Sequence, residues 1–173
     1  MTTTKKIIVR LACATVLGTA GVALTQVNRP QTAVVNAATT SVAARALGVD
    51  VASYQNADLS SHAQAGAQFA IVKVSEGTSY RNPKASSQIS TALSNNMMPM
   101  AYHFATFSSN ASAAAAEANY AIQTAQAFGL PKGSYIACDY ETGSGNNIYG
   151  GKTPTANAII AFMDTIKNAG YKP

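Results

Sequence analysis

Cysteine is scarce in this sequence, which contains two cysteines among its 173 residues. Cys13 falls in an N-terminal segment with the pattern of a secretory signal, so a secreted chain would keep Cys138 alone. One cysteine cannot close an internal disulfide, and we therefore expect the fold to depend on an ordinary hydrophobic core. Because Cys138 lies in an apolar run, it is expected to be buried and unreactive.

Basic clusters, nucleotide-binding motifs and metal-ligand spacings are also missing. Four of the 12 Lys and Arg residues precede Ala37, whereas all 7 Asp and Glu residues follow it, which leaves 8 basic against 7 acidic residues and a net charge of +1. This balance argues against a nucleic acid partner. No GxGxxG or Walker pattern follows an apolar run, and the two histidines, His62 and His103, lack the spacing of metal ligands. We therefore expect no cofactor and no metal.

Residues 1–37 have the layout of a secretory signal peptide, and residues 38–46 that of a short linker. Lysine and arginine form a positive start within 5–10, apolar and small residues follow over 11–24, and small residues around Ala37 suit a signal peptidase. The apolar run is short for a membrane span, which needs ~20 apolar residues, although an uncleaved N-terminal anchor is the alternative. We expect a secreted chain with no stable membrane span after cleavage.

Beyond the linker, short apolar runs alternate with segments of helical character. Such alternation favours an α/β fold with a parallel sheet and helical crossovers, either as an open doubly wound sheet or as a closed barrel. The pattern predicts strands at 46–53, 69–75, 98–105 and 134–141, and helices at 58–65, 83–95, 110–128 and 153–169.

Capping residues bound the predicted helices. The candidate N-caps, whose side chains can accept hydrogen bonds from first-turn N–H groups, are Asp58, Asn110 and Thr153. The candidate C-terminal stops, which suit a left-handed backbone, are Gly66, Gly129 and Gly170. Residues 171–173 then indicate the start of another strand, which predicts that the chain is incomplete at its C-terminal side.

Asp139 and Glu141 close the fourth predicted strand and are the strongest candidates for chemistry. Residues two apart on a strand point to the same face, with Cα atoms roughly 6.5–7 Å apart. Two carboxylates held so close resist joint ionisation, and one proton tends to stay on the pair. A neutral acid beside an anion is the arrangement that cleaves a glycosidic bond, because the acid protonates the leaving oxygen and the anion stabilises the positive charge at the sugar.

Further polar side chains lie at the same predicted edge, the C-terminal ends of the strands, where parallel α/β folds bind ligands. Asp50 and Glu76 are two of them, although a strand-end acid can also cap a helix or pair with a neighbouring lysine or arginine. His103 could shuttle a proton, but a hydrogen-bonded structural imidazole is the expected role. Aromatic residues that could stack on sugar rings, or simply pack in the core, are Tyr54, Tyr102 and Tyr140.

In combination, these segments resemble the glycoside hydrolase family 25 lysozymes, also called N-acetylmuramidases. The matching pieces are GVDVASYQ at 48–55, FAIVKVSEGTSY at 69–80, AYHF at 101–104 and DYE at 139–141, in the family's order and at similar spacing. Residues 47–173 are accordingly interpreted as the glycoside hydrolase domain. The resemblance implies a partial (β/α) barrel of the modified TIM-barrel type, with about four strand–helix units.

The resemblance also implies hydrolysis of the β-1,4 bond between N-acetylmuramic acid and N-acetylglucosamine in bacterial peptidoglycan, without a metal, in a secreted or cell-wall setting. It implies that Glu141 is the general acid, that Asp139 orients the substrate or stabilises charge, and that Asp50 assists in the same cleft. We expect the protein to act as a monomer. The expected substrate-binding residues are Glu76, Tyr54, Tyr102 and Tyr140.

The sequence departs from the family in two respects. It has no tryptophan, although family members usually place some near the sugar groove. It also stops after about the fourth strand–helix unit, so that the family's remaining strands, and an acid carried on a late strand, have no counterpart. A non-catalytic peptidoglycan-binding module, or an inactive fragment of such an enzyme, is therefore the alternative hypothesis.

Overall fold

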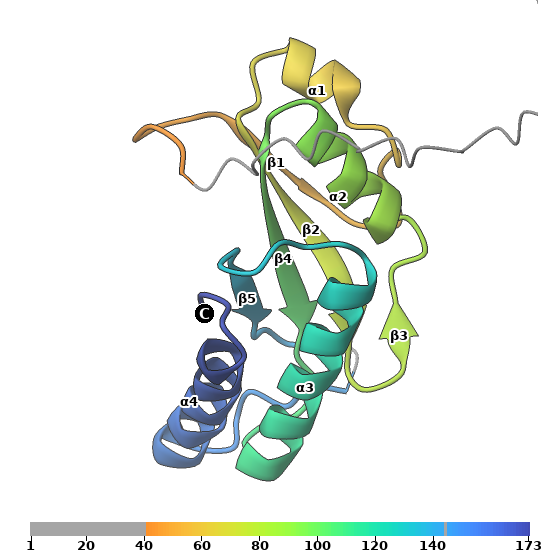
Figure 1. Ribbon diagram of the computed structural model, residues 1–173. Coiled ribbons are helices and arrows are strands. Elements are labelled where there is room, and N and C mark those ends of the chain that lie inside the picture. The colour runs from red at the N-terminus through yellow and green to blue at the C-terminus, as the bar shows by residue number, and fades with distance from the viewer. Residues whose placement is uncertain (1–40, 144) are drawn as a thin grey trace, which may run out of the picture. The chain divides into compact units, whose positions relative to one another are not determined.

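The computed structural model describes residues 41–143 and 145–173, so the predicted signal peptide and residues 38–40 of the predicted linker lie outside the described residues. The described chain is built around one sheet, whose strands run parallel except for one short strand (Figure 1). In spatial order, the parallel strands are β1 (Gly48–Val51), β2 (Phe69–Glu76), β4 (Met98–Phe104) and β5 (Ile136–Asp139). The short strand β3 (Tyr80–Arg81) pairs antiparallel with β2.

Helices connect the parallel strands, as the alternating pattern predicts. They are α1 (Ser60–Gln64), α2 (Ala85–Ser94), α3 (Ala111–Ala127) and α4 (Lys152–Asn168). This arrangement confirms the predicted α/β fold with a parallel sheet and about four strand–helix units, the pattern of a partial β/α barrel. Among the described residues, no helix combines the length and the hydrophobicity that crossing a membrane requires.

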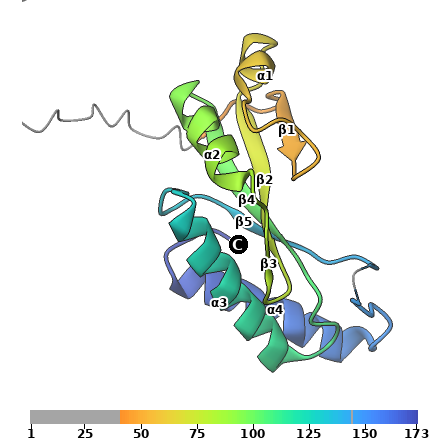
Figure 2. The same cartoon turned by 90° about the vertical axis from the view of Figure 1, so that its right-hand side faces the viewer.

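Alternation along the strands gives the sheet two different faces. On β2, Val72 and Val74 are fully buried, whereas Ile71 and Lys73 are only partly buried. Because successive side chains on a strand point to opposite faces, the buried set marks the face that packs against helices. Figure 2 shows α2 and α3 on the same side of the sheet. The polar side chains of the opposite face are therefore available to line a cleft.

A buried polar network centred on His103 lies in the core between the sheet and the helices. His103 of β4 is fully buried, with Nδ1 2.8 Å from the Ser75 hydroxyl and Nε2 3.0 Å from Oε2 of Glu117 on α3. Thr106 donates to the same carboxylate through its backbone N–H at 2.9 Å and its hydroxyl at 2.6 Å. Burial favours the neutral acid, but the hydrogen bonds from His103 and Thr106 outweigh it and lower the pKa of Glu117.

We expect Glu117→Gln to lower the free energy of unfolding at pH 7 by about 1–3 kcal/mol, because glutamine keeps the shape but loses the charge-assisted hydrogen bonds. Folding lowers the pKa of Glu117, so its stabilising effect is fully present above the pKa of glutamate in the unfolded chain, about 4.3. The stabilisation is lost as the pH falls through the lower pKa that Glu117 has in the folded chain. Urea unfolding between about pH 7 and about pH 3 should therefore show that the free energies of unfolding of wild type and variant become similar as the pH falls.

Asp164→Asn is the matched control for this prediction, because Asp164 is an exposed carboxylate on α4. We expect it to change stability by no more than about 0.5 kcal/mol across the same pH range. A Glu117→Gln variant whose deficit stayed constant down to low pH would contradict the assigned direction of the pKa shift.

The helix ends differ in part from the sequence predictions. Asn110 is an N-cap as predicted, because its side chain accepts from the N–H of Ala113. Thr153 is not an N-cap: α4 begins at Lys152, after Gly151, and Thr153 lies inside the helix. The predicted stops all follow their helices with positive φ, namely Gly66 at 97°, Gly129 at 82° and Gly170 at 80°.

The C-terminal residues extend the sheet beyond β5, as predicted. Lys172 forms a parallel bridge with Tyr135, in which Ile136 N–H donates to the Lys172 carbonyl and Lys172 N–H donates to the Ser134 carbonyl, both at 2.9 Å. The short strand β3 was not predicted, because two residues are too few to give a period.

Candidate functional site

A cleft with a volume of about 670 Å³ lies at the C-terminal ends of the parallel strands. Its lining comes from all five strands, β1 to β5, from the loop after β1 and from the segment after β5. This edge is where parallel α/β folds bind ligands. The cleft brings together six of the seven predicted site residues: Asp50, Tyr54, Glu76, Tyr102, Asp139 and Glu141.

The two central carboxylates reach the cleft by a different route from the predicted one. β5 ends at Asp139, so Glu141 lies in the following loop rather than on the strand. The prediction that both residues share one strand is therefore wrong, because pairing with β4 stops at Phe104 opposite Asp139. Both side chains nevertheless line the same cleft, with Asp139 half-buried and Glu141 exposed.

The electrostatics of the cleft follow from this gathering of acids. Burial raises the pKa of Asp139, and the negative charge of Glu141 raises it further, while the positive charge of Lys73 acts in the opposite direction. Partial burial also raises the pKa of Asp50, although that residue is more than a third exposed. Asp50 is thus not enclosed among its apolar strand neighbours, because its side chain faces the cleft.

Tyr102 of β4 lies among these acids. Burial raises the pKa of its phenol, and the charges of Asp50, Asp139 and Glu141 raise it further. The phenol therefore stays protonated and can donate a hydrogen bond to an acceptor in the cleft.

Lys73 also lines the cleft, although the sequence predicted no binding or catalytic role for it. Its ammonium group lies 2.6 Å from Oε2 of Glu76 and 4.8 Å from the centre of the Phe104 ring. The register between β2 and β4 shifts between Lys73 and Ser75, and such a bulge changes the direction in which the neighbouring side chains point. A lysine between Val72 and Val74 in an apolar strand was the signal for this residue, because it needs a polar environment on its own face.

The loop after β1 carries Tyr54, which is 93% exposed, and Gln55 into the cleft lining. The side-chain amide of Gln88 on α2 donates to the carbonyls of Ala52 at 2.9 Å and Asn56 at 3.1 Å. Two hydrogen bonds from a fully buried glutamine fix the backbone at both ends of the loop that carries Tyr54.

Tyr140 is the predicted site residue that does not line the cleft. Its ring packs against Phe107 with centroids 5.4 Å apart, and its hydroxyl donates to the Ser108 carbonyl at 2.8 Å. As a strand neighbour of Asp139 it points to the opposite face, which is the face of the core. The prediction that Tyr140 stacks on a sugar is thus not supported by its position.

Two other reactive side chains are withdrawn from solvent, that of Ser75 fully and that of Cys138 in part. Ser75, His103 and Glu117 form a Ser–His–carboxylate arrangement, but all three are buried, so no substrate can reach the hydroxyl. His103 is a structural imidazole, as expected. Burial raises the pKa of the Cys138 thiol to about 12, which keeps it protonated and unreactive near neutral pH.

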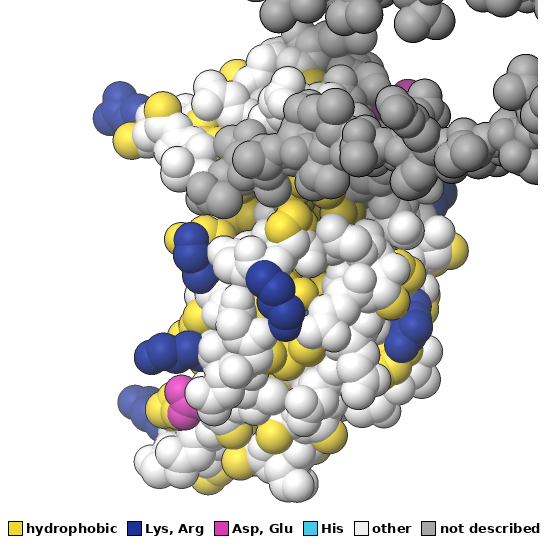
Figure 3. All heavy atoms as spheres, viewed as in Figure 1, with side chains coloured by type: hydrophobic (Ala, Val, Ile, Leu, Met, Phe, Trp, Pro, Cys, Tyr) yellow, Lys and Arg dark blue, Asp and Glu magenta, His cyan; other side chains and the backbone are white. Residues whose placement is uncertain are grey.

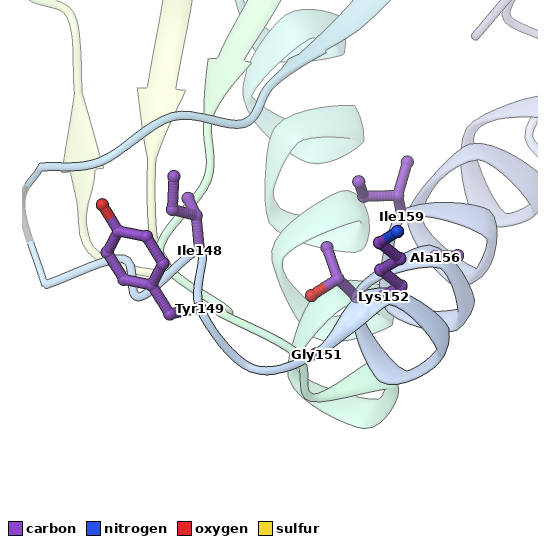
Figure 4. Close-up of a pocket in the computed structure, with 7 residues that line it drawn as sticks. Ile148, Tyr149, Gly151, Lys152, Ala156 and Ile159 are labelled. Atoms are coloured by element: carbon purple, nitrogen blue, oxygen red, sulfur yellow. The ribbon is translucent and has the colours of Figure 1, made fainter.

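Another pocket lies between the loop before α4 and the first turns of that helix (Figure 4). Ile148 and Tyr149 form one wall, and Lys152, Ala156 and Ile159 form the other (Figure 4). Its lining contains no carboxylate, so it does not offer the acid chemistry of the first cleft. On the face drawn in Figure 3, the described lysine and arginine side chains are spread singly rather than gathered into a basic patch.

The family model described as Glycosyl hydrolases family 25 matches residues 49–173. The lysozyme of Lactococcus phage mv1 is 40% identical over 128 residues, which are 73% of this chain and 62% of that protein.

Solved structures show the same similarity. The modular Cpl-1 endolysin, complexed with a peptidoglycan analogue, matches with a TM-score of 0.58 and 32% identity over 72% of this chain and 34% of that chain. The bacterial lysozyme from Streptomyces coelicolor matches with a TM-score of 0.59 and 25% identity over 73% of this chain and 60% of that chain. The chain thus spans less than two thirds of the length of each of these proteins.

Proposed function

The chain belongs to glycosyl hydrolase family 25, and from that premise we propose that it hydrolyses the β-1,4 bond between N-acetylmuramic acid and N-acetylglucosamine in bacterial peptidoglycan. The observation that carries the proposal is the convergence of Asp50, Asp139 and Glu141 in one cleft at the C-terminal edge of the sheet. The lysozyme relative and the endolysin complexed with a peptidoglycan analogue support the choice of substrate.

In the proposed reaction, Glu141 is the general acid. Its exposed carboxyl stands in the segment after β5, where it can reach the oxygen that links two sugars in the cleft. Transfer of its proton to that oxygen makes the departing sugar a neutral alcohol, which lowers the barrier to bond cleavage. The residue left behind is a carboxylate, which can take a proton from the incoming water in the second half of the reaction.

Asp139 is proposed to act on the other side of the bond. As a carboxylate beside the sugar ring it would stabilise the positive charge that develops there, or accept a hydrogen bond from the acetamido N–H and orient that group for attack. The ammonium group of Lys73 favours this anion by lowering the pKa of Asp139 against the effects of burial and of Glu141. Asp50 is proposed to assist from β1.

The remaining residues of the cleft are proposed to bind the glycan. The exposed ring of Tyr54 suits stacking on a pyranose face, and the protonated phenol of Tyr102 suits donation to a sugar oxygen. Glu76, paired with Lys73, is proposed to position a sugar hydroxyl. These residues come from one chain, so we infer a monomeric enzyme, and the N-terminal sequence pattern supports secretion to the cell wall.

The proposal is tested by digesting purified peptidoglycan and reducing the new sugar ends with borohydride. A muramidase leaves muramic acid at the reducing end, so muramitol should accumulate, and it should not do so with a Glu141→Gln variant. Accumulation of glucosaminitol would reject the proposed bond. Binding of peptidoglycan by the wild type without any new reducing end would favour the non-catalytic module instead.

A further inference from the structure

Ser108, in the loop between β4 and α3, has an unusual backbone. Its φ of 53° lies in the left-handed region, which residues other than glycine rarely adopt. Such a conformation costs free energy and persists only where the surroundings fix it, often beside a functional site. The surroundings of Ser108 are the segment that carries Glu141.

Three polar groups of Ser108 hold that segment on both sides of Glu141. Its carbonyl accepts the hydroxyl of Tyr140 at 2.8 Å, one residue before Glu141. Its backbone N–H donates to Oδ1 of Asn146 at 2.8 Å, and its hydroxyl accepts the N–H of Asn147 at 2.9 Å. We call Ser108, Tyr140 and Asn146 the Ser108 clamp; the contact of Asn147 uses its backbone N–H and leaves its side chain outside the clamp.

Asn146 connects the clamp directly to Glu141. Its side-chain Nδ2 donates to the Glu141 carbonyl at 2.8 Å, while its backbone N–H donates to the Gly143 carbonyl at 2.7 Å. Asn146 is only 7% exposed, so bulk water competes little for the hydrogen bonds of its amide. The oxygen of this amide therefore accepts a hydrogen bond from Ser108, and its nitrogen donates one to Glu141.

Close packing brings Gly143 and Gly150 of this segment against neighbouring side chains. A Cβ atom at Gly150 would overlap the side chain of Ser109, so that side chain packs directly against the backbone of Gly150. A Cβ atom at Gly143 would lie 3.3 Å from the Phe104 ring, and Phe104 lines the cleft. Among the described residues of this segment, Tyr140, Asn146, Asn147 and Gly150 thus contact the β4–α3 loop.

We propose that the Ser108 clamp sets the position of the Glu141 carboxyl, with Asn146 as the main positioning residue. The inference rests on the proposed function, in which Glu141 is the general acid. Glu141 lies outside β5 and lacks the strand hydrogen bonds that fix Asp139, so the clamp supplies what the strand does not. A misplacement of about 1 Å at a catalytic group can cost about 100-fold in rate.

Asn146→Asp and Tyr140→Phe test the clamp at two points. Asn146→Asp keeps an oxygen for the Ser108 N–H but removes the donor to the Glu141 carbonyl, and we expect kcat on soluble peptidoglycan glycan to fall about 10- to 100-fold with little change in KM. Tyr140→Phe removes one hydroxyl and keeps the ring against Phe107, and we expect a loss of about 3- to 10-fold.

Each variant has a matched control in the same segment. Asn147→Asp adds the same charge one residue later, at an exposed side chain whose oxygen can still accept the Tyr149 N–H. Tyr149→Phe removes the hydroxyl of a tyrosine that is 82% exposed. Both controls should retain kcat within about twofold, and thermal melting should show all four variants to be folded.

A second substrate distinguishes positioning of the acid from a general loss of structure. A 2,4-dinitrophenyl glycoside of an N-acetylated disaccharide has a leaving group that needs almost no protonation. The clamp variants should cleave it at nearly the wild-type rate while failing on the glycan. Equal losses on both substrates, or clamp variants no slower than their controls, would overturn the positioning role. A wild-type protein that cleaves neither substrate would overturn the proposed function, and the clamp's role with it.

Discussion

Replacing Glu141 by glutamine is expected to lower kcat on peptidoglycan by about 100- to 10,000-fold, the usual contribution of a general acid. Glutamine has the same size as glutamate but cannot donate a proton to the leaving oxygen. Because Glu141 is exposed, the substitution should leave the free energy of unfolding within about 0.5 kcal/mol of wild type. Binding of glycan should persist, because the tyrosines and the other acids of the cleft remain.

The rates of wild type and variant are compared by the release of reducing ends, and binding is measured by calorimetry with a soluble glycan fragment. Asp164→Asn again serves as the control, since it removes one exposed carboxylate from α4, outside the cleft lining. A Glu141→Gln enzyme that kept more than about a tenth of wild-type kcat would show that another group donates the proton.

Phe162→Ala is expected to lower the free energy of unfolding by about 3–5 kcal/mol, because Phe162 is the largest fully buried side chain among the described residues. Phe162 of α4 is fully buried, and its ring stacks on His103 with centroids 5.4 Å apart and on Phe107 at 6.0 Å. Its removal leaves a cavity between α4, β4 and the β4–α3 loop. Because such contacts join elements far apart in the sequence, their loss weakens the whole domain rather than one helix.

Urea denaturation followed by far-UV circular dichroism measures this effect. Met163→Ala is the matched control, because Met163 is the next residue of α4 and is 39% exposed. It should cost no more than about 1 kcal/mol. A Phe162→Ala variant as stable as Met163→Ala would show that α4 is not packed against the sheet in the way described.

The elements that could be predicted from the sequence are those with a local pattern. The four parallel strands and their helices follow from apolar runs and from stops such as Gly66 and Gly129, which need no knowledge of distant contacts. The two-residue strand β3 exists only because β2 is beside it. Thr153 had the chemistry of an N-cap, but the N-cap lies two residues earlier, at Gly151, whose φ of 92° suits glycine.

The candidate site was predictable to the extent that strand geometry determines it. Asp50, Glu76 and Asp139 lie where strand ends meet, and parallel strands bring their C-terminal ends to one edge. Tyr140 was assigned to the cleft because of its residue type, whereas alternation beside Asp139 turns it towards the core. The contacts of Ser108 with Asn146 span 38 residues of sequence, and no local pattern contains such information.

The most direct test of the account is a carbon-13 NMR titration of the Asp139 side chain, in the wild type and in Glu141→Gln. Asp139 and Glu141 line one cleft, where the charge of Glu141 acts on Asp139. We therefore expect a pKa for Asp139 above the ordinary value of about 3.9, so that its negative charge is lost early on acidification. We also expect that pKa to fall when the charge at Glu141 is removed. An Asp139 that titrates at its ordinary value, or that does not respond to Glu141→Gln, would contradict the account.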